Sequence, residues 1–347
     1  PELAKSCKEL YVFQRTPSSV DVRDNRPTDE AWFKDFATPG WQQRWLDNFC
    51  AVQTGLLPEE DMTQDGWTDI ARRVRSKIMA LPADEWTPDG MLRAFEDTDF
   101  EKMEEIRARV DSIVKDKTAA EGLKAWYRQL CKRPCFHDEY LQSFNTPGTK
   151  LVHTDGKGVE RITAKGVVAA GVEYEVDCII YASGFEFGTN HIRRMGFDPV
   201  GRDGVKLSDY WAEGMRTKHG MFVHGFPNLF IVQPGHGANL ISNVPHNLSE
   251  SGKTIATILR RALDSGTTEI ELTQKAEADW MELLHSGPGT FFGSTECTPG
   301  YYNNEGQPTV AGRDFMLGYP LGATAFFEYL AHWRASGFDG LEFRKAG

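Results

Sequence analysis

The pattern of apolar residues predicts strands on both sides of a long helical region. In the stretch "LYVFQRTP" most residues favour a strand, so we expect a strand over Leu10–Gln14 that ends before Pro17. After residue 145, "NTPGTKLVHT" is typical of a turn and a short strand. The stretch "ITAKGVVAAGVEYEV" has strand-forming residues separated by glycines, which predicts a hairpin or a meander.

Residues 21–128 show helical rather than strand periodicity. The clearest stripe is formed by Met103, Ile106, Val110 and Ile113, within a long charged stretch. A stripe of this kind is most simply the buried face of an amphipathic helix. We therefore expect this region to be mainly helical.

Two apolar runs near glycines predict an α/β arrangement. Val176–Ala182, in "VDCIIYASGF", has the continuous apolar character of a buried parallel strand and ends at Ser183 and Gly184. A second expected strand, Leu229–Gln233, is followed by a glycine-containing loop over Pro234–Asn243 and then by a helix. Ligands of such folds bind outside the carboxyl ends of the strands, so Gly184 and this loop are candidate ligand contacts.

Composition narrows the class of protein. The chain has 347 residues, 40% of them hydrophobic and 26% charged, as in ordinary globular proteins. A net charge of −11 argues against nucleic acid as a partner but does not exclude a local pocket for a phosphate. The cysteines lack zinc-binding spacing, so we expect no metal. There is no apolar run of about 18 residues and no apolar leader, so we expect no membrane span and a cytoplasmic location.

One motif of dinucleotide-binding proteins does not occur in the sequence. No G-x-G-x-x-G is present, and "PGHGANL" contains only G-x-G. If the protein binds a dinucleotide, its phosphate loop would precede Pro1. The sequence also begins without Met, and we therefore expect a fragment of a longer protein.

Five segments taken together resemble the Baeyer–Villiger monooxygenases, a branch of the flavin-containing monooxygenases. They are "LYVFQRTP", "CKRP", "VDCIIYASGFEFGT", "HGFPNLFIVQPGHGANLISN" and "TPGYYNNEGQP", and they occur in the family's order over nearly the whole chain. Within the family the chain looks nearest to enzymes of large cyclic ketones, the cyclopentadecanone and cyclododecanone monooxygenases. The resemblance implies an α/β flavoprotein fold with two dinucleotide-binding domains, Rossmann-like parallel sheets and a helical insert.

The same resemblance implies a domain organisation. Residues 1–20 and 129–172 would be the remainder of the NADP-binding domain, and 21–128 the helical insert. Residues 173–347 would be the C-terminal half of the FAD-binding domain. The N-terminal part of the fold would be missing, so we expect the isolated fragment to be inactive.

The resemblance also implies an activity. We expect an FAD- and NADPH-dependent monooxygenase that inserts one atom of O2 next to the carbonyl of a small-molecule ketone, through a flavin C4a-peroxide, to give an ester or lactone. One alternative is a flavin monooxygenase that oxygenates nitrogen or sulfur, although the insert and "CKRP" favour the ketone branch. Another is a catalytically incomplete fragment that acts as a binding module. Two G-x-G-x-x-G loops upstream would favour the enzyme over the module.

In the family the Arg and Thr of "QRTP" hold the 2′-phosphate of NADPH, which implies this role for Arg15 and Thr16. Guanidinium pairs with phosphate through two charge-assisted bonds, and the Thr adds a hydroxyl. Lys132 of "CKRP" would reach the same region of NADP, whereas Arg133 would lie beside the flavin as the catalytic charge. From residue type alone, Arg15 is more simply a solvated residue at the end of a strand, and the family context reverses that interpretation. The alternative for Lys132 and Arg133 is an ordinary basic helix end.

For FAD, the resemblance points to two places. "YASGF" corresponds to the family's interdomain hinge, with Ser183 in place of Thr, and Gly184 permits close approach of the cofactor. Backbone groups around Asn243 and Val244, at the start of a helix, would face the flavin ring. His236 is a possible acid or base, but we interpret it as a loop residue near the pocket.

The substrate pocket departs from the family's pattern. Many members carry a Trp in this stretch, and counting back from Gly306 places Thr298 at its position. We expect Thr298, Tyr301, Tyr302 and Asn303 to line the pocket instead. This difference bears on which ketone is accepted and not on the class of reaction.

Overall fold

The structure is a computed structural model that describes residues 1–56, 58–185, 191–233, 235–238, 243–287, 297–306 and 316–345. The chain forms two compact units. One comprises Pro1–Phe33 and Gln64–Gly184, and the other comprises Lys34–Thr63 and Phe185–Gly347. Residues of the expected helical insert are thus shared between the two units, and the assignment of the segments to NADP and FAD domains stays a prediction.

Two short parallel pairs of strands organise the first unit. β1 (Leu10–Gln14) pairs with β4 (Thr149–His153), so that Gln14 lies opposite His153 at the carboxyl ends of both strands. β2 (Val20–Asp21) pairs with β3 (Cys135–Phe136). The strand predicted at residues 10–14 and the turn and strand near residue 149 are therefore confirmed.

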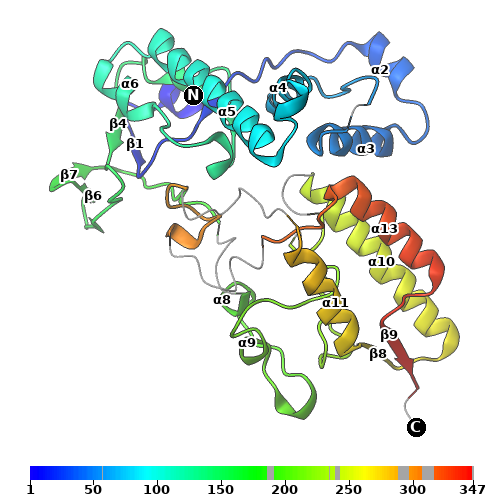
Figure 1. Cartoon of the computed structure of the whole chain (residues 1–347). Coiled ribbons are helices and arrows are strands. Elements are labelled where there is room, and N and C mark those ends of the chain that lie inside the picture. Colours follow the sequence, from blue (N-terminus) through cyan, green and yellow to red (C-terminus); the bar gives the residue numbers. More distant parts are fainter. Residues whose placement is uncertain are drawn as a thin grey trace. The chain divides into compact units, whose positions relative to one another are not determined.

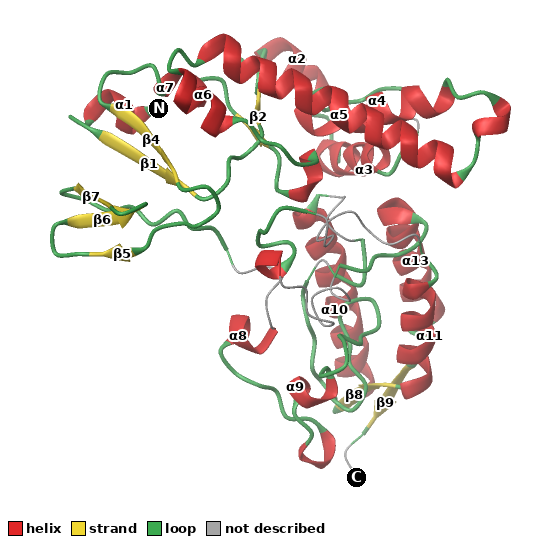
Figure 2. Cartoon of the chain, turned by 60° about the vertical axis from the view of Figure 1, so that its left-hand side comes forward, coloured by secondary structure: helices red, strands yellow, loops and turns green. Residues whose placement is uncertain are grey.

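The predicted meander is also present in the first unit. It consists of β5 (Arg161–Ile162), β6 (Gly166–Ala169) and β7 (Val172–Glu175), all antiparallel (Figure 2). A Cβ on Gly166 would lie 1.8 Å from the carbonyl oxygen of Tyr174, so only glycine fits there.

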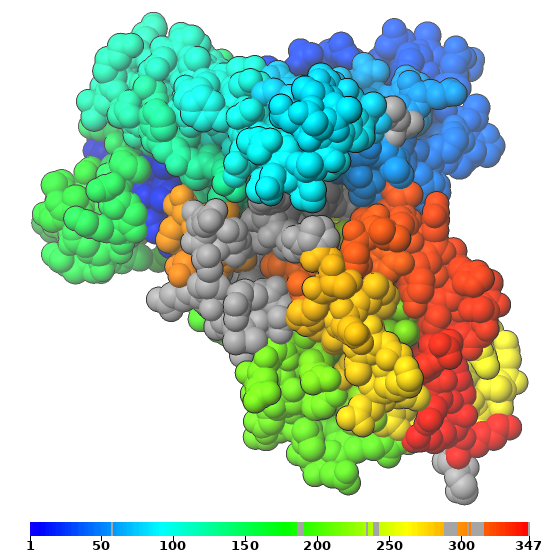
Figure 3. All heavy atoms as spheres, viewed as in Figure 1, coloured from blue at the N-terminus to red at the C-terminus, as the bar shows by residue number. Residues whose placement is uncertain are grey.

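Helices make up most of the rest of this unit. They are α1 (Glu2–Ser6), α4 (Gly66–Met79), η1 (Ala83–Glu85), α5 (Pro88–Ile113), α6 (Lys117–Leu123), η2 (Gln129–Cys131) and α7 (Tyr140–Ser143). The side chains of Asp65, Thr87 and Asp116 cap α4, α5 and α6 by accepting backbone N–H groups of the first turn. Met103, Ile106 and Val110 are buried, which confirms the predicted stripe. Figure 3 shows α4 and α5, in cyan, as one continuous surface.

A buried ion group joins these helices to the strands. The Lys102 ammonium of α5 lies 2.6 Å from an Asp21 carboxylate oxygen of β2 and 3.0 Å from one of Asp69 in α4. Burial works against the charge of Lys102, but the two carboxylates outweigh it and raise its pKa. The group therefore fixes β2, and with it β3, against the helices.

The second unit contains a different set of elements. They are α3 (Trp41–Gln53), α8 (His191–Met195), η3 (Arg202–Gly204), α9 (Leu207–Tyr210), α10 (Val244–Ser265), β8 (Glu269–Leu272), α11 (Gln274–His285), η4 (Asn304–Gly306), α13 (Gly322–Ser336) and β9 (Leu341–Arg344). α2 (Glu30–Phe36) lies where the chain passes from one unit to the other. α10 and α13 lie side by side (Figure 1), and Ile258 and Leu330, from their facing sides, belong to one buried core with Trp280 of α11.

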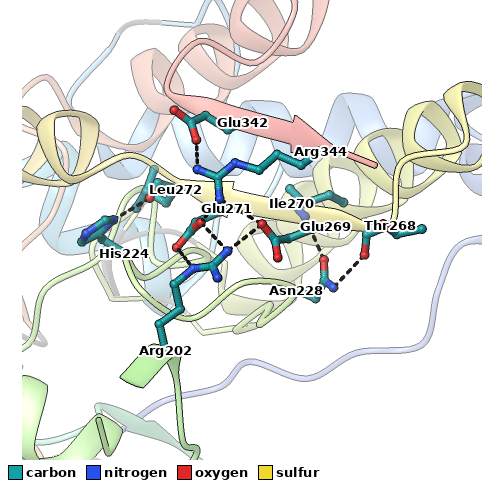
Figure 4. Close-up of polar contacts among 10 residues, drawn as sticks. All are labelled: Arg202, His224, Asn228, Thr268, Glu269, Ile270, Glu271, Leu272, Glu342 and Arg344. Carbon is teal, nitrogen blue, oxygen red and sulfur yellow. Dashed lines mark hydrogen bonds and ion pairs between the residues drawn. The ribbon is translucent and has the colours of Figure 1, made fainter. Parts of the chain in front are cut away.

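An ion network fastens the hairpin of β8 and β9 (Figure 4). The Arg202 guanidinium bonds Glu269 at 2.6 Å and Glu271 at 2.8 Å, and the Arg344 guanidinium bonds the same two carboxylates at 2.9 and 2.6 Å. The Asn228 side chain accepts the backbone N–H of Ile270 at 2.9 Å. The last strand of the described chain is thereby tied to the loop that contains η3.

Two predicted strands do not form. Val176–Ala182 is not a strand, and Ile180 and Tyr181 are 65% and 74% exposed. An apolar run becomes a parallel strand only when neighbouring strands bond its edges and helices cover its faces. Among the described residues, the parallel pairs are made by β1–β4 and β2–β3, and neither extends to this run.

Leu229–Gln233 is likewise not a strand, although helix α10 follows as predicted. Instead, the Ile231 N–H bonds the carbonyl of Met221 at 2.9 Å within irregular backbone. Of the loop predicted after it, residues 234 and 239–242 lie outside the described residues.

We expect Lys102→Met to destabilise the first unit by about 3–5 kcal/mol, because it leaves Asp21 as a buried charge without its counter-ion, whereas Asp69 keeps Arg73 at 3.0 Å. Urea denaturation followed by circular dichroism measures this loss. Lys5→Met, which removes an exposed ion pair, serves as the control and should leave the midpoint unchanged. Unchanged stability of Lys102→Met would show that the ion group does not join strands and helices.

The same ion group predicts a pH dependence. Burial of Asp69 disfavours its charge, but Lys102 and Arg73 together outweigh burial and lower the Asp69 pKa. The stabilisation is thus complete above the unfolded pKa of about 3.9 and is lost as the pH falls through the folded pKa. Lys102→Met should weaken this acid dependence without abolishing it, because Arg73 still pairs with Asp69.

Candidate active site

The carboxyl end of the β1–β4 pair presents the residues of "QRTP". The Gln14 side-chain amide donates to the carbonyl of Gly122 and lies 3.0 Å from His153 Nδ1. The Arg15 carbonyl accepts the N–H of Gly156 at 2.8 Å. These bonds hold the end of β1, so that Arg15 and Thr16 leave the sheet at the edge where parallel sheets bind ligands.

Lys132 meets this edge from a segment far away in the sequence. Its ammonium donates to the Thr16 hydroxyl and lies 5.6 Å from the ring centroid of Tyr127. The Tyr127 hydroxyl in turn donates to the carbonyl of Pro17 at 2.7 Å. The structure therefore brings Thr16 and Lys132 together, as the NADP assignment requires.

The donor set at this edge fits a phosphate group. Thr16 provides a hydroxyl and Lys132 an ammonium, and the exposed Arg15 directly precedes Thr16. Hydroxyl, ammonium and guanidinium groups are the side-chain donors that phosphates recruit in proteins. A local site of this kind is compatible with a negative net charge.

Arg133 lies in a different environment from that of Lys132. Its guanidinium carbon is 4.9 Å from the ring centroid of Trp67 in α4, and Trp67 packs edge-on against Phe136 of β3 at 5.1 Å. A Cβ on Gly66 would lie 2.2 Å from the Phe136 ring, so glycine at the start of α4 permits this packing. Arg133 is exposed and stacked, an arrangement that keeps its charge at the surface of the unit.

The residues predicted to contact FAD lie in both units. Ser183 and Gly184 are exposed, and Gly184 has a φ of 88°, a conformation that favours glycine. Asn243 caps α10, because its side-chain oxygen accepts the N–H of His246 at 3.2 Å. Val244 is the first residue of that helix, so its N–H belongs to a helix N-terminus as expected.

His236 is fully buried in the second unit. Its Nδ1 lies 2.8 Å from the Thr217 hydroxyl, and its carbonyl accepts the indole N–H of Trp280 at 3.1 Å. Because the His236 ring is buried and bonded to Thr217, we interpret His236 as a structural loop residue and not as an acid or base that reaches the substrate.

The stretch predicted to line the substrate pocket forms a tight turn. The Asn303 side-chain oxygen accepts the N–H groups of Gly300 at 2.9 Å and Gly306 at 3.0 Å, and its amide donates to the carbonyl of Cys297 at 3.1 Å. The rings of Tyr301 and Tyr302 lie 4.4 Å apart, and Thr298 is half-buried. Asn303 therefore organises the turn that carries the other three residues, a role the sequence did not reveal.

The sequence reasoning also missed Tyr127 and Trp67. Tyr127 precedes Lys132 by five residues in "WYRQLCKR", and that proximity was the only signal for its half-buried, hydrogen-bonded place beside Lys132. Trp67 belongs to none of the sequence motifs, and its contact with Arg133 is created by the fold, because the two residues lie far apart in the sequence. Across the ranges that the structure describes, there is no cluster of three or more metal-ligating side chains and no helix that could cross a membrane.

The chain is similar over nearly its whole length to several monooxygenases. It is 45% identical over 339 residues to Baeyer–Villiger monooxygenase ATR8 of Stachybotrys chlorohalonatus, a match that covers 97% of this chain and 54% of that protein. It is 46% identical over 349 residues to neopentalenolactone D synthase of Streptomyces avermitilis, covering 99% of this chain and 58% of that protein. A scan against models of protein families gives no match.

Solved structures agree with these relatives. The polycyclic ketone monooxygenase of Thermothelomyces thermophila superposes with a TM-score of 0.84 at 35% identity, over 99% of this chain and 57% of that one. A steroid monooxygenase bound to NADP gives a TM-score of 0.72 at 20% identity, over 100% of this chain and 64% of that one, and it bears on the fold alone.

The fold is that of the flavoproteins with two dinucleotide-binding domains. Within that class the chain is a homologue of the Baeyer–Villiger monooxygenases, as the sequence motifs predicted. The chain spans slightly more than half the length of the relatives it matches.

We expect Asn303→Ala to lower the melting temperature, because two N–H groups and one carbonyl of the turn lose their partner. The corresponding loss is about 1–3 kcal/mol for a buried group left unsatisfied. Differential scanning fluorimetry measures it. Tyr301→Phe, in the same turn, keeps the ring and is the control. Equal melting temperatures for both variants would contradict the structural role of Asn303.

Proposed function

We propose that the chain is part of an FAD- and NADPH-dependent Baeyer–Villiger monooxygenase, which converts a ketone to an ester or lactone with one atom of O2. The observation that carries this proposal is the hydrogen bond from Lys132 to Thr16 at the end of β1. Arg133 is the next residue after Lys132 in the sequence. The homologues named Baeyer–Villiger monooxygenase support it, as do the related structures that hold FAD and NADP.

NADPH would be held through its 2′-phosphate. Thr16 donates or accepts through its hydroxyl, Lys132 adds a positive charge to the same spot, and Arg15 offers a planar pair of donors from the strand end. NADH lacks this phosphate and would leave the three groups without an anionic partner. These side chains therefore select the cofactor.

FAD, when bound, supplies the redox chemistry that reduces and activates O2. Of the described residues, Ser183 and Gly184 would meet it along exposed backbone, and the first N–H groups of α10 at Asn243 and Val244 would face its ring. Gly184 fits this role because a Cβ there meets no atom within 4 Å and its positive φ disfavours other residues.

Arg133 would supply a fixed positive charge where the oxygen atom is inserted. A guanidinium stays protonated at all working pH values, unlike a desolvated lysine. The Trp67 face orients it without neutralising it. Negative charge that develops on oxygen during insertion is stabilised by such a preorganised donor.

The substrate would be a ketone of some size. The name of one related structure, a polycyclic ketone monooxygenase, supports a bulky substrate. Thr298, in place of a larger side chain, would leave room, and Tyr301 and Tyr302 would provide apolar surface near it. A cytoplasmic location stays a prediction.

We expect Arg15→Ala to weaken NADPH binding about 10- to 100-fold while NADH binding changes little, because one charge-assisted interaction with the 2′-phosphate is lost. Steady-state kinetics of the full-length enzyme measure this in the KM for each cofactor. Arg161→Ala, which removes an exposed arginine of the meander, is the control. Equal losses for both cofactors would remove Arg15 from the phosphate site.

We expect Arg133→Ala to lower the rate of ester formation about 10²- to 10³-fold, since one preorganised charge donor is lost. NADPH consumption should continue, because hydride transfer from NADPH to FAD would need no charge at this position, and the electrons would then leave on O2 as hydrogen peroxide. Product analysis beside stopped-flow reduction separates the two steps. Arg133→Lys should restore little, because lysine lacks the planar fork. A normal ester yield from Arg133→Ala would place the catalytic charge elsewhere.

A further inference from the structure

We propose that Tyr127 is a positioning residue that sets the preference for NADPH over NADH, by holding the Thr16 turn and the Lys132 ammonium in one arrangement. The inference rests on the proposed 2′-phosphate site. It concerns a side chain that would not itself touch the phosphate but contacts both segments that would.

The Tyr127 hydroxyl closes the turn that follows Thr16. It donates to the carbonyl of Pro17 at 2.7 Å and accepts the N–H of Ser19 at 3.2 Å. One hydroxyl thereby bonds the chain on both sides of residue 18. Because Pro17 has no N–H of its own to bond, this hydroxyl is an important restraint on the backbone that places Thr16.

The Tyr127 ring supports the second half of the site. The Lys132 ammonium lies 5.6 Å from the ring centroid while it donates to the Thr16 hydroxyl. A lysine side chain has four rotatable carbons, so an attractive aromatic face reduces the space through which its charge moves. The ring therefore restrains Lys132 and the hydroxyl restrains the turn after Thr16, and both restraints place donors of the proposed phosphate site.

Tyr127 is itself held rigidly. On one side the Ala125 carbonyl accepts an N–H of the Arg107 guanidinium at 2.8 Å, and on the other the Gln129 N–H donates to Asp99 at 2.9 Å. Both partners belong to α5. Burial raises the pKa of the Tyr127 hydroxyl, so it stays protonated and keeps donating to Pro17 at every working pH.

A purely structural role predicts a different result from a positioning role. If Tyr127 only fills space, removing its hydroxyl lowers stability or weakens both cofactors equally. If it positions the phosphate site, the ratio of the Kd values for NAD+ and NADP+ falls. One neutral hydrogen bond corresponds to about a 2- to 10-fold change in affinity. We expect the Kd for NADP+ to rise by this factor and the Kd for NAD+ to stay nearly the same.

The test measures binding rather than turnover. Kd values for NADP+ and for NAD+ are determined by calorimetry for the unaltered protein, Tyr127→Phe, Tyr127→Leu and Tyr140→Phe. Tyr127→Phe keeps the ring and loses the hydroxyl, and Tyr127→Leu loses both. Tyr140→Phe, on α7 beside Phe144 in the same unit, is the matched control. Melting temperatures report on folding.

We expect Tyr127→Phe to raise the Kd for NADP+ about 2- to 10-fold and Tyr127→Leu to raise it further, with NAD+ changed less than 2-fold. A double-mutant cycle with Lys132→Met adds a second measure. In that background Tyr127→Leu should have a smaller effect than in the unaltered protein, because the ring that it removes acts on Lys132.

Each other outcome overturns the inference. If the unaltered protein binds NADP+ and NAD+ equally, the proposed phosphate site fails and the inference fails with it. If it prefers NADP+ but Tyr127→Phe keeps the full preference, only the inference fails. Parallel losses for both cofactors, or effects of Tyr127→Leu and Lys132→Met that add fully, would leave Tyr127 a structural residue.

Discussion

The buried charge of Lys102 is the constraint on which the first unit depends. Its ammonium bonds Asp21 and Asp69 and so joins β2 to two helices. β2 lies shortly after Thr16 in the chain, and its partner β3 begins two residues after Arg133. A single ion group within the helices thus determines where both parts of the proposed site lie. Burial makes this arrangement specific, because a misplaced carboxylate would leave the ammonium unpaired at a cost of several kcal/mol.

A second constraint is that a parallel strand needs neighbouring strands, and the exposed apolar run at 176–182 illustrates it. Ile180 and Tyr181 follow the meander in a segment that has the composition of a core strand but is largely exposed. Parallel strands are stable only with bonded neighbours, and the chain spans slightly more than half the length of its relatives. The same chain nevertheless forms α10, whose cap and packing are supplied by nearby residues and by α13. The backbone hydrogen bonds of a helix lie within its own segment, whereas those of a parallel strand need segments distant in the chain.

This difference explains how much the sequence could predict. The strand at residues 10–14, the meander and the stripe on α5 follow from local periodicity, and each is confirmed. The strands predicted at 176–182 and 229–233 were wrong. Their apolar composition is typical of a buried strand, but a strand forms only where a neighbouring strand bonds it. Within the site, the motifs predicted that Thr16 and Lys132 belong together. They could not reveal that Asn303 is used within its own turn, because that depends on backbone geometry.

The fold separates the side chains of Lys132 and Arg133, although the two residues are neighbours in the sequence. Lys132 has extended backbone, with φ of −130° and ψ of 166°. Successive side chains of extended backbone point to opposite sides. Lys132 accordingly reaches Thr16 and Tyr127, whereas Arg133 stacks on Trp67. A helical backbone would turn the two side chains only about 100° apart and crowd two positive charges together. The short extended segment between η2 and β3 therefore directs the two basic side chains to different neighbours, as the two roles proposed for them would need.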